Sequence, residues 1–158
     1  MTIGTNLTLV SDNFATFFEV EKIESPNALL NIPKVAYLKD VKAAGTDGGS
    51  ATSGSFQTRT LNTETDPFGI VTLSSNQFTL QAGTYEIDAT VPGYGVDSYV
   101  ARLRNITDST DAIVGSAEKS LNTQPTTTAS LIKDVISITS AKTFEIQQRV
   151  TTTRASTG

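Results

Sequence analysis

The sequence predicts an all-β protein, an antiparallel sandwich or barrel, and three observations lead there. Apolar and polar residues alternate with a period of two, most clearly in Thr84–Val91. Threonine and serine occur in runs such as Thr126–Thr128 and Thr151–Thr153, and β-branched threonine suits the solvated face of a pleated sheet. No window of about 11 residues sustains the 3.6-residue period of an amphipathic helix. Short strands separated by turns are therefore expected throughout.

Two segments carry the alternation best. Thr84–Val91 lies between Gly83 and Pro92-Gly93, and Phe144–Val150 alternates in the same way with Gln148 as the polar exception on its apolar face. Both are expected to be half-buried antiparallel strands. Seven further segments are expected to be strands: Val35–Val41, Ser55–Leu61, Ile70–Leu73, Phe78–Leu80, Tyr99–Ile106, Ala112–Ala117 and Ser130–Ile138.

The segment Ser130–Ile138 breaks the simple alternation. Leu131 and Val135 have one parity, whereas Ile132, Ile136 and Ile138 have the other. This slip predicts either a β-bulge or a strand that is buried on both faces.

The chain length of 158 residues fits one domain with a short extra segment. We expect an N-terminal arm at residues 1–33 with one strand at about 14–24, a β domain at 34–152 and a polar tail at 153–158. Residues 43–55 are small and polar, which predicts an exposed, flexible loop. The start of the chain has no charged segment followed by an apolar one, so a protein without a signal peptide is expected.

The arm carries five large apolar residues: Phe14, Phe17, Phe18, Val20 and Ile23. Leaving them in water is costly at roughly 25 cal/mol per Å² of apolar surface. We therefore expect the arm to dock on another surface and treat these five residues as a candidate assembly site.

Composition excludes several classes of function. The net charge is −4 and the cationic residues are scattered, which argues against nucleic acid and membrane partners. The chain has no histidine and no cysteine, so the usual Ser–His, Cys–His and His-ligated metal sites are excluded. We predict that the protein is not an enzyme and has no catalytic residue, cofactor or metal.

Three polar patterns have a functional and a structural interpretation. Glu19 and Glu21 share one strand face, where solvated side chains are favoured over a catalytic acid–base pair. Asp108–Asp111 could offer oxygen ligands to a cation but lacks the spacing of a calcium loop, so a turn is favoured. Gly45, Gly48 and Gly49 lack the following Lys-Ser/Thr of a phosphate-binding loop and favour a flexible connection.

A resemblance to a known family rests on three stretches taken in order. They are Ser55–Thr63, Leu73–Tyr85 and Ala101–Thr107, and the second contains the pattern Phe78-x4-Gly83-x-Tyr85-x-Ile87. Over roughly residues 34 to 152 the chain resembles the jelly-roll domains of phage tail fibres and related virion proteins, in the wider tumour necrosis factor-like and complement globular-head superfamily. The resemblance implies an antiparallel jelly-roll sandwich that assembles as a homotrimer around a threefold axis.

The sequence departs from the family pattern at its C-terminal end. Family members continue past the strand equivalent to Phe144–Val150 into one more apolar strand, whereas this chain continues into a polar tail. The arm segment Phe14–Glu24 looks like that strand moved to the front. We expect a circularly permuted or strand-swapped jelly roll, in which the arm either completes its own sandwich or inserts into a neighbour.

Three functions agree with this resemblance. The first is a capsid decoration (cement) protein, a trimer on the outer surface of the capsid that clamps the major capsid protein lattice of a phage head. The second is the receptor-binding tip of a tail fibre, in which Tyr94, Tyr99 and Phe68 would stack on a host surface glycan. The third, an extracellular ligand module of the tumour necrosis factor type, is disfavoured by the missing signal peptide and cysteines. The chain is nearly all jelly roll, which favours decoration.

Four residues are candidates for intersubunit contacts. Arg102 and Arg104 share one face of their strand, where they either pair with acidic residues of a neighbour or face water. Tyr94 and Tyr99 are candidates for the trimer interface, with burial in the core as the alternative.

Overall fold

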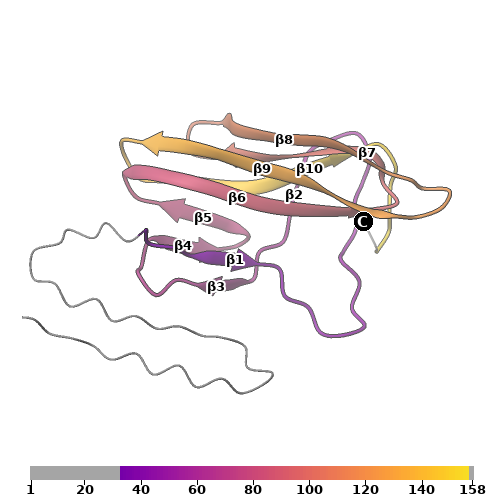
Figure 1. Cartoon of the computed structure of the whole chain (residues 1–158), viewed down its shortest axis with the longest axis horizontal. Helices are drawn as coiled ribbons and strands as arrows, with labels where there is room; N and C mark the ends of the chain where they lie inside the picture. Colours follow the sequence, from indigo (N-terminus) through magenta and orange to yellow (C-terminus); the bar gives the residue numbers. More distant parts are fainter. Residues whose placement is uncertain (1–32, 157–158) are drawn as a thin grey trace, which may run out of the picture. The chain divides into compact units, whose positions relative to one another are not determined.

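A computed structural model describes residues 33–156, which form ten strands and no helix (Figure 1). The strands are β1 (Tyr37–Lys39), β2 (Gln57–Thr58), β3 (Thr63–Thr65), β4 (Val71–Ser74), β5 (Gln77–Leu80), β6 (Gly83–Tyr94), β7 (Asp97–Asn105), β8 (Thr110–Ser120), β9 (Thr127–Ile138) and β10 (Lys142–Val150). Within these described residues, nothing resembles a helix that could span a membrane.

The strands form one large sheet and two small ones, and all their pairings are antiparallel. The large sheet has six strands in the order β4-β5-β10-β7-β8, with β2 also paired to β10. Strands β6 and β9 pair along their whole length, from Gly83 opposite Ile138 to Tyr94 opposite Thr127. Strands β1 and β3 form the second small sheet.

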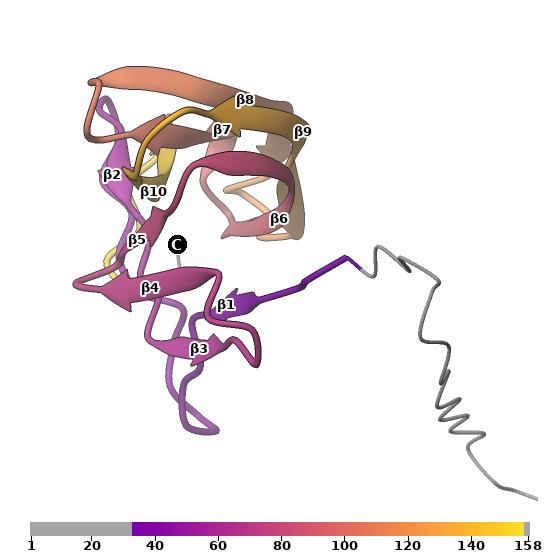
Figure 2. The same ribbon diagram turned by 90° about the vertical axis from the view of Figure 1, so that its left-hand side faces the viewer.

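The core lies between the six-stranded sheet and the β6–β9 sheet, which face each other in Figure 2. Phe144, Leu103 and Ile132 are almost completely buried there. The rings of Phe78 and Phe144 stack with centroids 5.9 Å apart. The chain is therefore an all-β antiparallel sandwich with a jelly-roll-like fold, as the alternating pattern predicts.

Each of the nine segments predicted within residues 33–156 overlaps a strand, and one further strand was missed. The missed strand, β3, has the polar sequence Thr63-Glu64-Thr65 and shows no apolar alternation. It forms because β1 lies opposite, with Leu38 paired to Glu64. Between β4 and β5, Ser75 and Asn76 both have positive φ angles of 52° and 66°, typical of a two-residue hairpin turn.

The slip within Ser130–Ile138 has a different cause from either predicted one. Strand β9 pairs with β6 without interruption, so it contains no bulge in that ladder. Leu131 and Val135 are 52% and 59% exposed, so β9 is not buried on both faces either. The slip arises because Ile132, Ile136 and Ile138 face the core, whereas Leu131 and Val135 are apolar residues on the outward face of the same strand.

The predicted flexible loop at 43–55 forms backbone hydrogen bonds with the residues that follow β10. Ala51 and Arg154 exchange two backbone hydrogen bonds of 2.9 and 2.7 Å, and Gly49 N–H donates to the Ser156 carbonyl. Ala51 is fully buried with Val96, Tyr99 and Val150 in a second apolar cluster. Full exposure of this loop was therefore a wrong expectation at Ala51, because backbone pairing with residues distant in sequence orders it.

Candidate interaction surface

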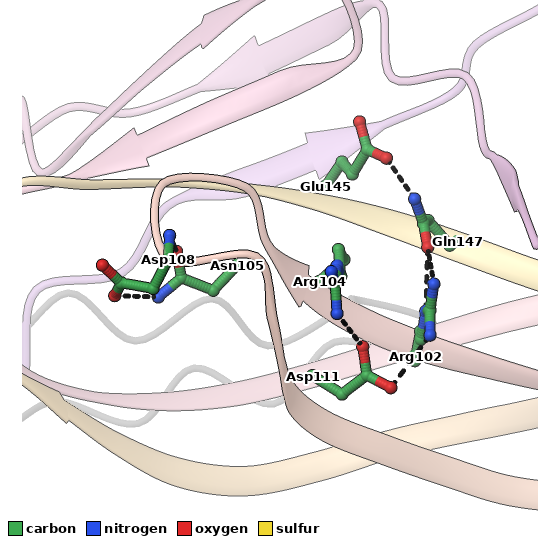
Figure 3. Close-up of polar contacts among 7 residues, drawn as sticks. All are labelled: Arg102, Arg104, Asn105, Asp108, Asp111, Glu145 and Gln147. Carbon is green, nitrogen blue, oxygen red and sulfur yellow. Dashed lines mark hydrogen bonds and ion pairs between the residues drawn. The ribbon is translucent and has the colours of Figure 1, made fainter.

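The two arginines of β7 pair within the chain, an arrangement that the sequence did not predict. Arg102 and Arg104 both contact Asp111 of β8, with Nη1–Oδ distances of 2.9 and 2.7 Å (Figure 3). Arg102 also donates to the Gln147 side-chain oxygen at 2.8 and 2.6 Å. Its guanidinium stacks on Phe56, 3.6 Å from the ring centroid. These contacts join β7, β8 and β10 on the outer face of the large sheet.

The network continues to Glu145, which is only 6% exposed. Its carboxylate accepts hydrogen bonds from Thr58 and Gln77 at 2.9 and 3.0 Å, and also from Gln147. Burial acts to raise the pKa of Glu145, but the hydrogen bonds from Gln77, Gln147 and Thr58 outweigh it, so the pKa lies below its usual value. The residue is therefore a structural anion that ties β2, β5 and β10 together.

The acidic segment Asp108–Asp111 forms a turn whose carboxylates already have cationic partners. Asp108 pairs with Lys142 at 2.6 Å, which holds the pKa of that carboxyl below its usual value. Asn105 closes the turn by accepting the Asp108 N–H and donating to its carboxylate (Figure 3). Among residues 33–156, no group of three or more acidic side chains is arranged to hold a metal ion.

An open cavity of about 430 Å³ lies beside this turn, at one end of the sandwich. Ile136, Ile138 and Phe144 contribute apolar surface, and Asp108 and Lys142 contribute charged groups. Because these two charges pair with each other, the cavity suits a neutral polar ligand better than an ion.

The aromatic residues proposed to stack on a glycan do not form one surface. Tyr99 is only 3% exposed and its hydroxyl hydrogen-bonds Thr128, so within one chain it is buried, which is the alternative to an interface or glycan role. Tyr94 is 38% exposed and lies against the Arg154 guanidinium, 6.0 Å from the ring centroid. Phe68 is half exposed in the connection between β3 and β4. Every second residue of β7 from Tyr99 to Asn105 is buried, so Tyr99 lies on the inward face of that strand.

The five apolar residues of the predicted arm, Phe14, Phe17, Phe18, Val20 and Ile23, lie outside the described residues, as do Glu19 and Glu21. The permuted or strand-swapped jelly roll stays a prediction.

Three exposed aliphatic side chains lie on the neighbouring strands β8 and β9. Val114 of β8 is 62% exposed, and Leu131 and Val135 of β9 are similarly exposed. The Ser116 hydroxyl accepts the Leu131 N–H and the Ser120 hydroxyl donates to the Thr126 carbonyl, so β8 and β9 run antiparallel. Val114 therefore falls at a level between Leu131 and Val135. We call these three residues the seam.

Acidic residues of β6 flank the seam. Glu86 is directly opposite Val135 in the β6–β9 ladder, and Asp88 is opposite Lys133, with which it forms an ion pair of 2.8 Å. All three charged residues are exposed on the same outer face as Leu131 and Val135. Lys133 lies between Leu131 and Val135 on this face, and the two acids Glu86 and Asp88 outnumber it, so the seam is a mixed apolar surface with a net negative charge beside it.

A second exposed apolar group lies on β1 and on the residues that flank it in sequence. Val35, Tyr37 and Val41 are 44%, 59% and 55% exposed, whereas the alternate residues Ala36 and Leu38 pack against the core. The outward set also includes Lys39, whose ammonium lies 5.7 Å from the centroid of the Tyr37 ring. We call Val35, Tyr37, Lys39 and Val41 the β1 face.

Sequence reasoning missed both surfaces, although each leaves a signal in the sequence. Aliphatic residues of both parities in Ser130–Ile138 and in Val35–Val41 give each strand two apolar faces. The core covers one of those faces and leaves the other exposed.

Comparisons of the chain with protein-family models, with curated proteins and with solved structures find no match.

Proposed function

We propose that this chain is a structural virion protein, a trimeric capsid decoration protein that stabilises a phage head by clamping neighbouring capsid subunits on the outer surface. The observation that carries the proposal is the pair of exposed apolar surfaces, the seam and the β1 face, on a jelly-roll-like sandwich. A protein that holds neighbours together needs contact surfaces of this kind.

The polar groups support the same proposal. Arg102, Asp111 and Glu145 are engaged in hydrogen bonds and ion pairs within the sandwich. A cross-linked outer sheet suits a protein that resists mechanical load, because each strand is tied to its neighbours by side chains as well as by the backbone.

The resemblance to virion jelly rolls supplies the assembly. Repeated copies on a lattice convert weak individual contacts into strong overall binding. The major capsid protein is the proposed partner, and neither nucleic acid nor a membrane is involved.

The test begins with an antibody raised against the purified chain. It should label the heads of the phage whose genome encodes the chain. Deleting the gene should yield heads that release DNA at a lower temperature. Adding the purified chain back should restore the original release temperature. Labelling of the tail alone, or a deletion that leaves release unchanged, contradicts the proposal.

The alternative is the receptor-binding tip of a tail fibre that recognises a host surface glycan. The open cavity lined by Asp108 and Lys142 favours it, because its mixture of apolar side chains, hydroxyls and one ion pair suits a neutral polyhydroxyl ligand. Antibody labelling of fibre tips, with binding of the purified chain to host cells, would select this alternative.

A further inference from the structure

We propose that copies of this chain associate head to tail, with the β1 face of one copy docked on the seam of the next. The occupant of each surface is thus a second copy of the same chain. The inference deepens the proposed function, on which it rests for the closed trimer.

The two surfaces are complementary in chemistry. Each has an aliphatic or aromatic centre, Tyr37 with two valines on one side and the seam on the other. The β1 face carries Lys39, whereas the acids beside the seam, Glu86 and Asp88, outnumber Lys133, which pairs with Asp88. Burial of the apolar centres would supply affinity, and the opposite charges at the rim would set orientation and favour encounter.

The two surfaces also lie on different sides of the sandwich. In Figure 2, β8 and β9 are side by side at the top, and β1 and β3 are at the bottom. A twofold axis would place both surfaces of each copy in one shared interface, and their separation on the sandwich prevents this. Contact between unlike surfaces is heterologous and either closes into a ring or continues as a filament. Closure after three copies gives the proposed trimer.

Two substitutions that each disable one surface provide the main test. Tyr37→Asp leaves the seam intact, and Val135→Asp leaves the β1 face intact. Each variant alone should sediment as a monomer while keeping the wild-type circular dichroism spectrum. Mixing the two should yield a one-to-one dimer, because one intact seam and one intact β1 face remain in the pair.

The control and the contrary outcomes are equally definite. Leu121 is 43% exposed in the connection between β8 and β9, outside both surfaces, so Leu121→Asp should keep the wild-type assembly. A mixture of the two variants that stays monomeric overturns the head-to-tail contact. So does a variant that keeps the wild-type oligomer, or a wild-type chain that is monomeric at every concentration.

A charge exchange tests the contact without placing an acid in an apolar centre. Glu86→Lys and Lys39→Glu should each raise the concentration at which the oligomer half-dissociates by about tenfold, because like charges then meet across the contact. The double variant should return to within about threefold of wild type, since the opposite charges are restored. Additive weakening in the double variant contradicts the pairing.

The failure of this contact and the failure of the proposed function are distinguishable. If the variants assemble as expected but the antibody finds no label on phage heads, the head-to-tail contact stands and the decoration function falls. If heads are labelled and the variants still form wild-type trimers, the contact between the seam and the β1 face is wrong.

Discussion

The hydroxyl of Ser130 on β9 donates to the Ser116 carbonyl on β8 at 2.6 Å and also accepts the backbone N–H of Ala101 on β7 at 3.0 Å. Ser116 reciprocates by accepting the Leu131 N–H on its own hydroxyl at 3.0 Å. The register shift between β7 and β8 occurs at Ala101, where that ladder leaves the backbone N–H to a side chain. The fully buried Ser130 hydroxyl thus gives the Ala101 N–H a hydrogen-bond acceptor at the bulge and links β9 to β7 and β8.

Replacing Ser130 by alanine should destabilise the sandwich by about 2 kcal/mol, because the buried Ala101 N–H and Ser116 carbonyl each lose a partner. Urea unfolding followed by circular dichroism measures the change. Ser137→Ala is the matched control on the same strand. Ser137 is exposed, its hydroxyl bond to Thr84 is at the surface, and the loss should stay within about 0.5 kcal/mol. Equal losses in the two variants would contradict the buried role of Ser130.

Gly115 is expected to resist substitution, because β9 approaches it closely. A Cβ atom there would lie 2.8 Å from the Leu131 carbonyl oxygen and 3.0 Å from Ile132 Cγ1. Gly115→Ala should cost about 2 kcal/mol, since a backbone group must move to make room. In the control Gly83→Ala, the atoms nearest to the new Cβ belong to the Tyr85 side chain, at 3.2 Å, and a side chain can turn aside more easily than a backbone carbonyl. Thermal unfolding should show the larger loss for Gly115→Ala.

Gln148 presents the opposite case, a position where substitution should stabilise the protein. Its side chain is 2% exposed, and its Oε1 atom has no hydrogen-bond partner among the described residues. Gln148→Met keeps a similar shape and removes the buried oxygen, so the free energy of unfolding should rise by about 1 kcal/mol. The midpoint of urea unfolding reports the change. A lower midpoint would mean that the amide has a role that these contacts do not include.

Stability should fall in acid partly through Glu145. Its pKa is lower in the folded protein than in the unfolded chain, so the folded state is favoured while the carboxylate is ionised. This contribution is complete above the usual glutamate value of about 4.3 and is lost as the pH falls through the lower folded-state pKa. Glu145→Gln should therefore be less stable than wild type at pH 7 and should lose less stability between about pH 5 and 2. Unfolding free energies across that range provide the measurement, and parallel curves would exclude this linkage.

The sequence by itself determined the elements with strong alternation. Thr84–Val91 forms the centre of β6, and Phe144–Val150 forms most of β10. A period of two in apolar residues produces a strand when one face of the segment must be buried. Gly83 and Pro92-Gly93 were expected to be turn residues at the ends of Thr84–Val91, but they lie inside β6 and pair with β9, because the partner strand extends the ladder past them. The all-β class followed from the same pattern.

Tertiary structure decided the partners of individual side chains. The pairing of Arg102 and Arg104 with Asp111 depends on β7 lying beside β8, and Tyr99 is buried because its face of β7 is covered by residues from distant segments. Alternation tells which residues share a face of a strand but not which face is covered. For that reason the exposure of Leu131, Val135 and Tyr37, which carries the proposed assembly, could be recognised only once the sheets were packed.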